Sequence, residues 1–168
     1  MNILITGGTG FVGSHMIDYI LKYAIKPDQK IYCTKRWMED TKNVDHINDE
    51  RFEFVDCDLI DAHSIRRAVE VSKPEKVFHF AAQSFPEVSF KTPVITLQTN
   101  TVGTTHLLEA IKESDYDPVI VSVSTSEVYG MPEEDEVPIK ETNPIRAANP
   151  YSISKVGHDL MSQYYYKA

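Results

Sequence analysis

The sequence has 168 residues, of which 42% are hydrophobic and 25% charged, and this fits one globular domain with a substantial core. A net charge of -8 argues against an extended basic surface, so we expect neither nucleic acid nor a membrane as a partner. The chain starts directly with a predicted strand and has no apolar run long enough to span a bilayer, which predicts a cytoplasmic protein. The histidines lack metal-ligand spacing, so no metal is expected, and Cys33 and Cys57 fit buried thiols.

Apolar segments alternate with amphipathic ones along the whole chain. The pattern predicts strands near residues 2–6, 30–34, 52–55, 76–80 and 118–123, helices near 11–24, 61–72, 94–113 and 150–167, and a short helix or turn over 43–48. Repeated β-α units imply a parallel sheet with helices on both faces. The predicted fold is therefore α/β, a Rossmann-like doubly wound parallel sheet. Residues 1–168 are assigned to one dinucleotide-binding domain with no separate substrate domain, and the acidic stretch 133–136 is predicted to be solvated loop.

A glycine-rich turn joins the first strand to the first helix, with glycines at 8, 10 and 13 in the spacing G-x-G-x-x-G. Glycines allow a tight turn and a close approach of the backbone to a pyrophosphate, and the N-terminus of the following helix offers unpaired N–H groups to that anion. The alternative is an ordinary glycine-rich turn, but the position between a strand and an amphipathic helix favours a dinucleotide site. The residues assigned to the dinucleotide here are Gly7, Gly10, Phe11, Val12 and Gly13.

The ends of the next three strands extend the predicted cofactor site, because ligands of such sheets bind beyond the carboxyl ends of the strands. The second strand ends at Lys35 and Arg36, and a basic residue here favours NADP, whereas a carboxylate favours NAD. Arg36 thus predicts NADP rather than NAD; the alternative is a surface basic pair, since Glu39 and Asp40 are close in sequence. Asp58 and Leu59 after the third strand, and Ala81 and Ala82 after the fourth, complete the set.

Four side chains after the fifth strand carry the predicted chemistry. Thr125 and Glu127 follow that strand, and Tyr151 and Lys155 lie four residues apart, on one face of the last predicted helix. An ammonium group near a phenol stabilises the phenolate, so this pair is suited to moving a proton. A Y-x-x-x-K pattern alone is commonly structural, but the glycine-rich turn and the Thr/Glu strand end precede it in the order that a catalytic site requires.

With these motifs, the chain resembles the extended short-chain dehydrogenase/reductase family (NAD-dependent epimerase/dehydratase), and within it most closely the GDP-mannose 4,6-dehydratases. The resemblance covers nearly the whole length and includes the glycine-rich turn, Lys35-Arg36, the segments 43–47, 81–84, 88–90 and 103–110, Thr125-Ser126-Glu127 and Pro150-Tyr151 to Lys155. It implies a nucleotide-sugar substrate, with Gln83, Ser84 and Ser126 as substrate-binding residues.

The resemblance also implies a mechanism. Tyr151, with Lys155 and the Thr125 hydroxyl, would take the proton of the sugar 4-hydroxyl while hydride passes from C4 to NADP, and Glu127 would take the C5 proton before water leaves from C6 and the hydride returns there. Thr125, Glu127, Tyr151 and Lys155 are thus the expected catalytic residues. An epimerase or a simple reductase needs no C5 base, which makes Glu127 the residue that favours a 4,6-dehydratase.

Members of this family continue well beyond the tyrosine-lysine helix, so the resemblance implies that the C-terminal substrate-binding part is missing here. In the family, the helices corresponding to 94–113 and 150–167 pair across a dimer, and we expect a homo-dimer or tetramer. Three alternatives to a 4,6-dehydratase stay open within the family: a nucleotide-sugar epimerase, a 4-reductase and a decarboxylase. A fourth is a non-catalytic NADP-binding fragment.

Overall fold

The computed structural model describes residues 2–168, and the chain in it clusters into two compact units. One unit comprises the chain up to Ala82 together with His106–Val123, and the other comprises Gln83–Thr105 together with Ser124–Ala168. The first unit contains the sheet, and the second is mostly helical.

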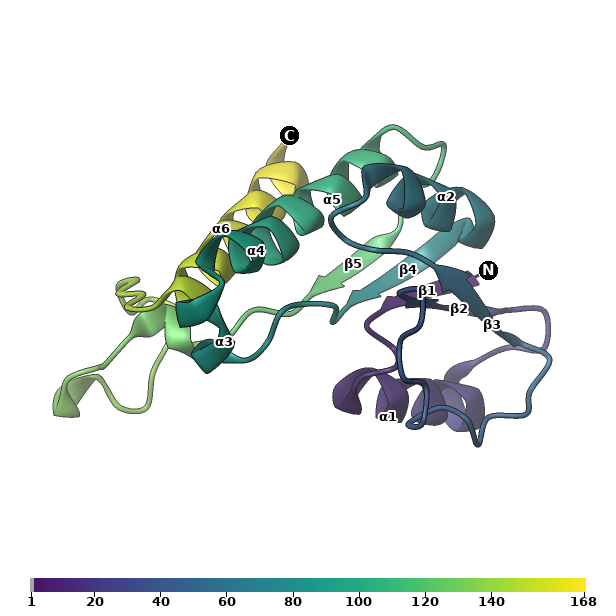
Figure 1. Ribbon diagram of the computed structural model, residues 1–168, viewed down its shortest axis with the longest axis horizontal. Coiled ribbons are helices and arrows are strands. Elements are labelled where there is room, and N and C mark those ends of the chain that lie inside the picture. Colours follow the sequence, from purple (N-terminus) through teal and green to yellow (C-terminus); the bar gives the residue numbers. More distant parts are fainter. Residues whose placement is uncertain (1) are drawn as a thin grey trace. The chain divides into compact units, whose positions relative to one another are not determined.

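The first unit is built on five strands: β1 (Asn2–Thr6), β2 (Ile31–Lys35), β3 (Phe52–Asp56), β4 (Pro74–His79) and β5 (Val119–Ser122). Their order in the sheet is β3-β2-β1-β4-β5, and every neighbouring pair is parallel (Figure 1). The order reverses between β1 and β4, which is the point where dinucleotides bind in doubly wound sheets. The predicted Rossmann-like fold is confirmed, with strand bounds within two residues of the prediction.

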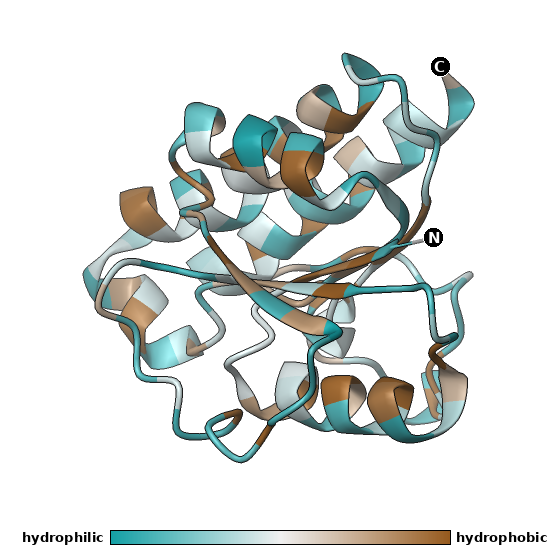
Figure 2. Ribbon diagram, turned by 90° about the vertical axis from the view of Figure 1, so that its right-hand side faces the viewer, coloured by the Kyte–Doolittle hydropathy of each residue, from teal (hydrophilic) through white to brown (hydrophobic). Residues whose placement is uncertain are grey.

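Helices cover both faces of this sheet because alternate strand residues point to opposite sides. Ile3 and Ile5 of β1 pack with Ile17 of α1 (Phe11–Tyr19), which a π-helical turn extends over Ile20–Ala24. Leu4 of the same strand packs on the other face with α2 (Ala62–Ser72) and the second half of α5 (Gly103–Lys112). Figure 2 shows the apolar residues, in brown, running along the strands. The predicted turn over 43–48 is also present, as a turn over residues 42–46.

Both cysteines lie in these cores as free thiols, as the sequence predicted. Burial raises the pKa of Cys33 to about 12 and that of Cys57 to about 11. Thiols with such high pKa values are poor nucleophiles, so their role is packing.

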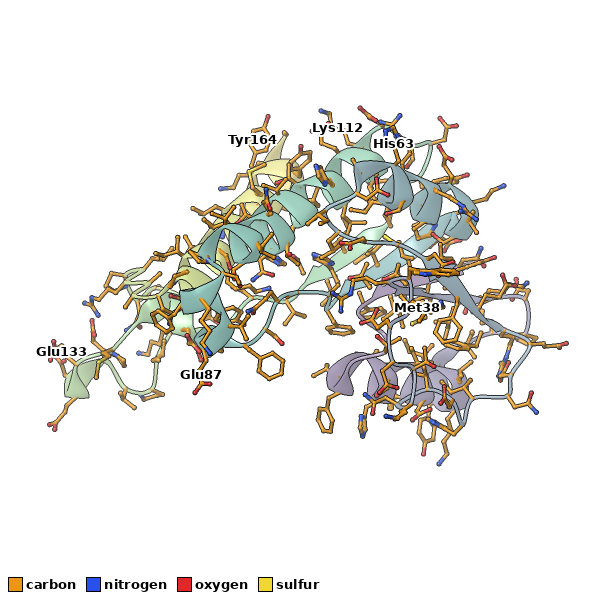
Figure 3. All side chains as sticks on the ribbon, in the orientation of Figure 1. Met38, His63, Glu87, Lys112, Glu133 and Tyr164 are labelled. Carbon is orange, nitrogen blue, oxygen red and sulfur yellow. The ribbon has the colours of Figure 1, made fainter. Side chains whose placement is uncertain are left out.

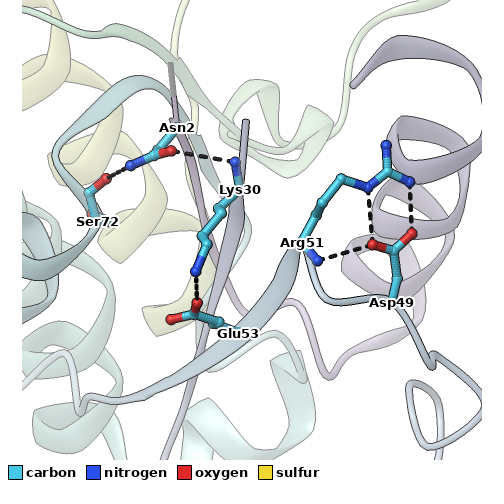
Figure 4. A network of polar contacts seen from close by, with 6 residues as sticks. All are labelled: Asn2, Lys30, Asp49, Arg51, Glu53 and Ser72. Carbon is cyan, nitrogen blue, oxygen red and sulfur yellow. Dashed lines mark hydrogen bonds and ion pairs between the residues drawn. The ribbon is translucent and has the colours of Figure 1, made fainter. Parts of the chain in front are cut away.

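The amino ends of the strands are tied together by polar side chains (Figure 4). The Asn2 amide donates to the Ser72 carbonyl at 2.8 Å and accepts from the Lys30 N–H at 3.2 Å, and the Lys30 ammonium pairs with Glu53. These contacts join β1 to the end of α2 and to the start of β2. They lie at the amino ends of the strands, whereas the glycine-rich turn follows the carboxyl end of β1.

The second unit is organised around α6 (Pro150–Lys167), which packs against α3 (Pro86–Lys91), α4 (Pro93–Leu97), the π-helical turn Gln98–Val102 that follows α4, and the 3-10 turn Ser126–Tyr129. A Cβ at Gly157 would lie 2.7 Å from Thr101 Cγ2, so glycine there allows α6 to approach the Gln98–Val102 turn closely. The Thr101 hydroxyl donates to the Ser154 carbonyl at 2.8 Å across this contact.

Two features of the second unit differ from the sequence prediction. Helix α3 was not predicted, because its six residues are too few to show a helical period. It is separated from α4 at Thr92, which precedes Pro93 and has a non-helical φ of -133°. The predicted helix 94–113 is present as α4, the π-helical turn and α5 in direct succession.

The loop of residues 130–149 is mostly exposed, and Glu133 lies on its outer part (Figure 3). The acidic run is nevertheless ordered by specific contacts. Glu136 pairs with the Arg146 guanidinium at 2.6 Å, which lowers the pKa of that carboxyl to about 2. Glu133 and Glu136 also form a capping box around the 3-10 turn Glu134–Glu136. Among residues 2–168, no helix has the length and hydropathy needed to cross a membrane.

Candidate functional site

The glycine-rich turn leads from β1 into α1, and two of its glycines are required by contacts. Gly7 has a φ of +70°, and a Cβ there would lie 2.7 Å from the Ala81 nitrogen. A Cβ at Gly13 would lie 2.3 Å from the Gly7 carbonyl oxygen and 2.6 Å from the Gly8 Cα. Only glycine fits these positions without a backbone shift, so the turn is tight and α1 starts directly against it.

The N-terminus of α1 fits an anionic group of a dinucleotide. Gly10 is the N-cap and supplies no side-chain hydrogen bond to the first turn, while Phe11 and Val12 are exposed. A Cβ at Gly10 would meet only the Gly7 carbonyl oxygen, at 3.3 Å, so a side chain there would enter otherwise open space. The uncapped N–H groups and the open approach are the features that a pyrophosphate needs.

Hydrogen bonds fix the carboxyl ends of β1 and β4 beside this turn. The Thr6 hydroxyl lies 2.6 Å from His79 Nδ1 and accepts from the Ala81 N–H at 3.2 Å. Ala81 is therefore held against Gly7. Thr6 and His79 were not singled out from the sequence, since each reads as an ordinary residue of a buried strand.

Lys35 and Arg36, the basic residues from which the sequence predicted NADP, each pair with an acidic side chain. The Arg36 backbone N–H donates to Glu39 Oε2 at 2.7 Å, and its guanidinium lies 3.6 Å from Glu39 Oε1. Lys35 pairs with Asp56 at 2.9 Å. The exposed Arg36 side chain (65%) and the Glu39 carboxylate thus lie next to each other after the end of β2. The proximity of Glu39, which the sequence raised as a complication, is real.

Asp58 and Leu59, the two predicted cofactor residues after β3, have different surroundings. The Asp58 carboxylate accepts from the Ile60 N–H at 3.1 Å and orders its own turn. Leu59 is 7% exposed and belongs to the core, and its carbonyl oxygen lies 3.1 Å from His106 Nδ1. Any contact of Leu59 with a cofactor would have to use its backbone N–H.

The second unit holds all four predicted catalytic residues. Thr125 caps the 3-10 turn Ser126–Tyr129, where its hydroxyl oxygen accepts from the Glu127 N–H at 3.3 Å. The Glu127 carboxylate in turn accepts from Asn149 Nδ2 at 2.9 Å. Asn149 is the N-cap of α6, so the Ser126–Tyr129 turn and the tyrosine-lysine helix are linked directly.

Tyr151 and Lys155 lie one turn apart on α6, and both are buried, with exposed fractions of 9% and 4%. Burial lowers the pKa of Lys155 to about 8, against a smaller opposing effect of Asp159. Lys155 therefore remains mainly protonated at neutral pH while its proton is held less tightly than usual. An ammonium in a buried site is the group that a phenolate on the same helix face needs.

A buried polar network that the sequence did not indicate surrounds this pair. His158 Nδ1 lies 3.4 Å from the Lys155 ammonium and 2.8 Å from the Thr104 hydroxyl. Burial, and next the Lys155 charge, lower the pKa of His158 to about 4, so the ring is neutral. Asn100 Nδ2 donates to Ser154 Oγ at 2.9 Å and to the Gln83 carbonyl at 3.0 Å. The i,i+3 spacing of Lys155 and His158 was the one available signal, because it puts both on one helix face.

The predicted substrate-binding residues are at the surface of the second unit. The Gln83 amide is engaged with the Phe85 backbone, accepting at 2.8 Å and donating at 3.1 Å, and Ser84 is exposed. Ser126 is also exposed and lines a cavity of about 590 Å³ together with Thr125. Val128 and Tyr129 of the same turn, residues of α6 and residues of the 141–145 loop also line it.

Ser124 lines the same cavity and has the one buried side-chain polar atom without a hydrogen-bond partner among the described residues. Across residues 2–168, no group of three or more His, Cys, Asp or Glu side chains is arranged to hold a metal ion.

Comparisons with known proteins agree with these features. The family model described as GDP-mannose 4,6 dehydratase matches residues 4–168. The dTDP-D-glucose 4,6-dehydratase of Homo sapiens is 34% identical over 171 residues, which cover 98% of this chain and 47% of that protein. The UDP-glucose 4-epimerase of Streptococcus mutans is 34% identical over 157 residues, with 93% of this chain and 44% of that protein covered.

Solved structures give the same result. The dTDP-glucose 4,6-dehydratase of Streptomyces venezuelae, solved with NAD bound, superposes with a TM-score of 0.89 at 30% identity, over 100% of this chain and 52% of that one. The chain thus spans about half the length of the proteins it matches.

Proposed function

We propose a function on one premise, which is that this chain belongs to the extended short-chain dehydrogenase/reductase family, in its group of nucleotide-sugar 4,6-dehydratases and epimerases. The whole protein is proposed to be a lyase that removes water from a nucleoside-diphosphate hexose. GDP-mannose is the proposed substrate and GDP-4-keto-6-deoxymannose the product, with NADP at the glycine-rich turn.

The observation that carries this proposal is the contact between the Glu127 carboxylate and Asn149 at the N-terminus of α6. It puts a carboxylate beside the helix that bears Tyr151 and Lys155. Water loss across C5 and C6 of a sugar requires a base for the C5 proton in addition to the group that handles the 4-hydroxyl. A carboxylate and a phenol on neighbouring elements provide two such groups.

Each residue then has one proposed task. Tyr151 takes the proton of the sugar 4-hydroxyl onto its phenol oxygen, the buried Lys155 ammonium stabilises the resulting phenolate, and the Thr125 hydroxyl hydrogen-bonds the sugar oxygen. Glu127 takes the C5 proton. A bound nicotinamide dinucleotide supplies the reversible oxidation of the sugar at C4.

The cofactor-binding residues proposed are Gly7, Gly10, Phe11, Val12, Gly13, Arg36, Asp58, Leu59, Ala81 and Ala82, with Tyr151 and Lys155 at the reactive end. Arg36 supports NADP, because its exposed guanidinium can pair with a 2'-phosphate. Two observations favour NAD as the second candidate, namely the Glu39 carboxylate at Arg36 and the NAD in the related Streptomyces venezuelae structure.

Competitive titration of both dinucleotides tests the choice. Replacing Arg36 with alanine is expected to weaken NADP+ binding roughly tenfold or more, as the loss of one charge-assisted contact would, and to leave NAD+ binding unchanged. Tighter binding of NAD+ than of NADP+ to the unchanged chain would overturn the NADP assignment.

The assembly is proposed to be a homo-dimer or tetramer that uses α4 and α6. Ile95 of α4 and Ile153, Leu160 and Tyr164 of α6 are apolar or aromatic and at least half exposed, and the outward position of Tyr164 is visible in Figure 3. Such side chains favour burial against a second copy. Sedimentation of the purified chain tests this, and a monomer at tens of micromolar would contradict it.

The reaction is tested by product mass. The chain is incubated with NADP+ and with GDP-, UDP-, dTDP- and CDP-hexoses, and the expected product is lighter by one water for the GDP sugar. Replacing Glu127 with glutamine is expected to abolish water loss while dinucleotide binding persists. Retained water loss in this variant would remove the reason for placing the protein among dehydratases.

The second candidate function is a nucleotide-sugar 4-epimerase, which the relative from Streptococcus mutans favours. An epimerase would give a product of unchanged mass with inverted configuration at C4. With NADPH and a nucleotide-linked 4-keto sugar added to the panel, a 4-reductase would be recognised by a gain of two hydrogens. With a nucleotide-linked uronic acid and the oxidised cofactor, a decarboxylase would be recognised by a loss of carbon dioxide. A folded chain that binds dinucleotide and converts none of the sugars would be a non-catalytic fragment.

A further inference from the structure

Asn149 uses both ends of its side-chain amide. Its Oδ1 accepts from the Ser152 N–H at 2.7 Å, and the Ser152 hydroxyl accepts from the Asn149 N–H at 3.1 Å, which together form a capping box. Its Nδ2 donates to Glu127 Oε2 at 2.9 Å. The capping bond fixes the rotation of the amide, because the oxygen must face the helix, and the donor group is therefore directed at the carboxylate.

Capping alone does not explain an asparagine at this position. Serine, aspartate and asparagine cap helices about equally well, and each needs only an acceptor oxygen for that purpose. What asparagine adds is an NH2 group separate from the capping oxygen, and the structure places that NH2 group on a carboxylate that the proposed function requires. Asn149 is half-buried, so the contact is partly shielded from competing water.

We propose that Asn149 is a positioning residue that holds the Glu127 carboxylate in register with the Tyr151 helix. This inference rests on the proposed function, in which Glu127 is the C5 base. At the other end, the Thr125 hydroxyl holds the backbone of Glu127, so main chain and carboxylate are both fixed. Within residues 2–168 the carboxylate has no other hydrogen-bond partner, which leaves Oε1 to receive the substrate proton.

Three substitutions separate positioning from capping. Asn149→Ser keeps the capping oxygen and removes the amide NH2 group that reaches Glu127, Asn149→Asp keeps the cap and replaces that NH2 group by a second carboxylate oxygen, and Asn149→Ala removes both. Asn48→Ser makes the same chemical change at an exposed residue of the first unit and serves as the matched control. The thermal midpoint is expected to fall by about 2–4 °C for Asn149→Ala and to stay unchanged for Asn149→Ser.

The contact is tested first without any substrate. In an amide-detected NMR spectrum, the side-chain NH2 signals that disappear in Asn149→Ser belong to Asn149. These signals are expected to change position in Glu127→Gln, because the amide then faces a neutral group instead of a carboxylate, and to stay in place in Asn48→Ser. Signals that keep their position in Glu127→Gln would overturn the inference.

The role is tested next by the water-loss assay. Asn149→Ser is expected to lower kcat about 10- to 100-fold with little change in KM, as a slight misplacement of a reacting group does, and Asn149→Asp to lower it further. Full activity of Asn149→Ser with a defect only in Asn149→Ala would mean that the residue is a cap and nothing more. An inactive wild-type chain would instead refute the proposed function for this chain, and the NMR comparison of the variants then decides the contact alone.

Discussion

Replacing Gly13 with alanine sets two physical effects against each other. Gly13 lies in the first turn of α1, where alanine is the better helix former by about 1 kcal/mol. The added Cβ, however, would lie 2.3 Å from the Gly7 carbonyl oxygen and 2.6 Å from the Gly8 Cα. Both are backbone atoms of the glycine-rich turn, so a change of rotamer cannot relieve the clash.

The steric effect is expected to prevail. Forcing an extra carbon into a packed region costs about 3 kcal/mol at the upper end of the usual range, and subtracting the gain in helix propensity leaves about 2 kcal/mol of lost stability. For a chain of this size, that corresponds to a thermal midpoint lower by about 4–8 °C. Gly10→Ala is the matched control, because its Cβ would meet one atom at 3.3 Å.

The two variants should therefore separate stability from binding. Gly13→Ala is expected to lower the thermal midpoint, whereas Gly10→Ala is expected to lose at most about 1 kcal/mol of stability and to weaken dinucleotide binding by filling the space at the N-terminus of α1. Thermal unfolding and a dinucleotide titration measure the two effects. A raised midpoint for Gly13→Ala, or equal destabilisation of both variants, would refute this account of the turn.

Three further predictions concern stability alone. The pKa of His158 is lowered from 6.5 to about 4, so between these pH values only the unfolded chain binds the proton and folding stability should fall as the pH drops. In unfolding measured as a function of pH, His158→Gln should lose less stability over this range. Ser124→Ala should leave the thermal midpoint unchanged or raise it slightly, since it removes a buried hydroxyl without a partner; a clear fall would mean that the hydroxyl is bonded in solution. The Asp61 side chain accepts from the His63 N–H at the start of α2. Asp61→Ala should therefore lower the free energy of unfolding in urea by about 1 kcal/mol, whereas Asp61→Asn should leave it almost unchanged.

The fold was predictable because its signals are local. Ile3, Leu4 and Ile5 form a short continuous apolar run, which is typical of a strand covered on both faces, and the structure buries Leu4 on one face and the two isoleucines on the other. The glycines after β1 and the Asn-Pro pair before α6 mark a helix start each, and both helices begin there in the structure. Helix α3 escaped prediction for the opposite reason, since six residues between two prolines carry no period.

The candidate site was predictable as a set of residues but not as an arrangement. The residue types and spacing of Tyr151 and Lys155, and the carboxylate at 127, follow from the sequence alone. Its contact with Asn149, and the burial that lowers the pKa of Lys155, exist only after residues more than twenty positions apart are brought together.

The sequence by itself thus determined the order of the β-α units, the glycine-rich turn and the spacing of the candidate site residues, because each depends on neighbours within a few positions. Only the tertiary structure decided that the Glu127 carboxylate contacts Asn149, that Leu59 is committed to the core and that the Thr104 hydroxyl lies against His158. Such properties depend on which side chains share a buried space, and a buried space is formed by elements that are distant in the chain.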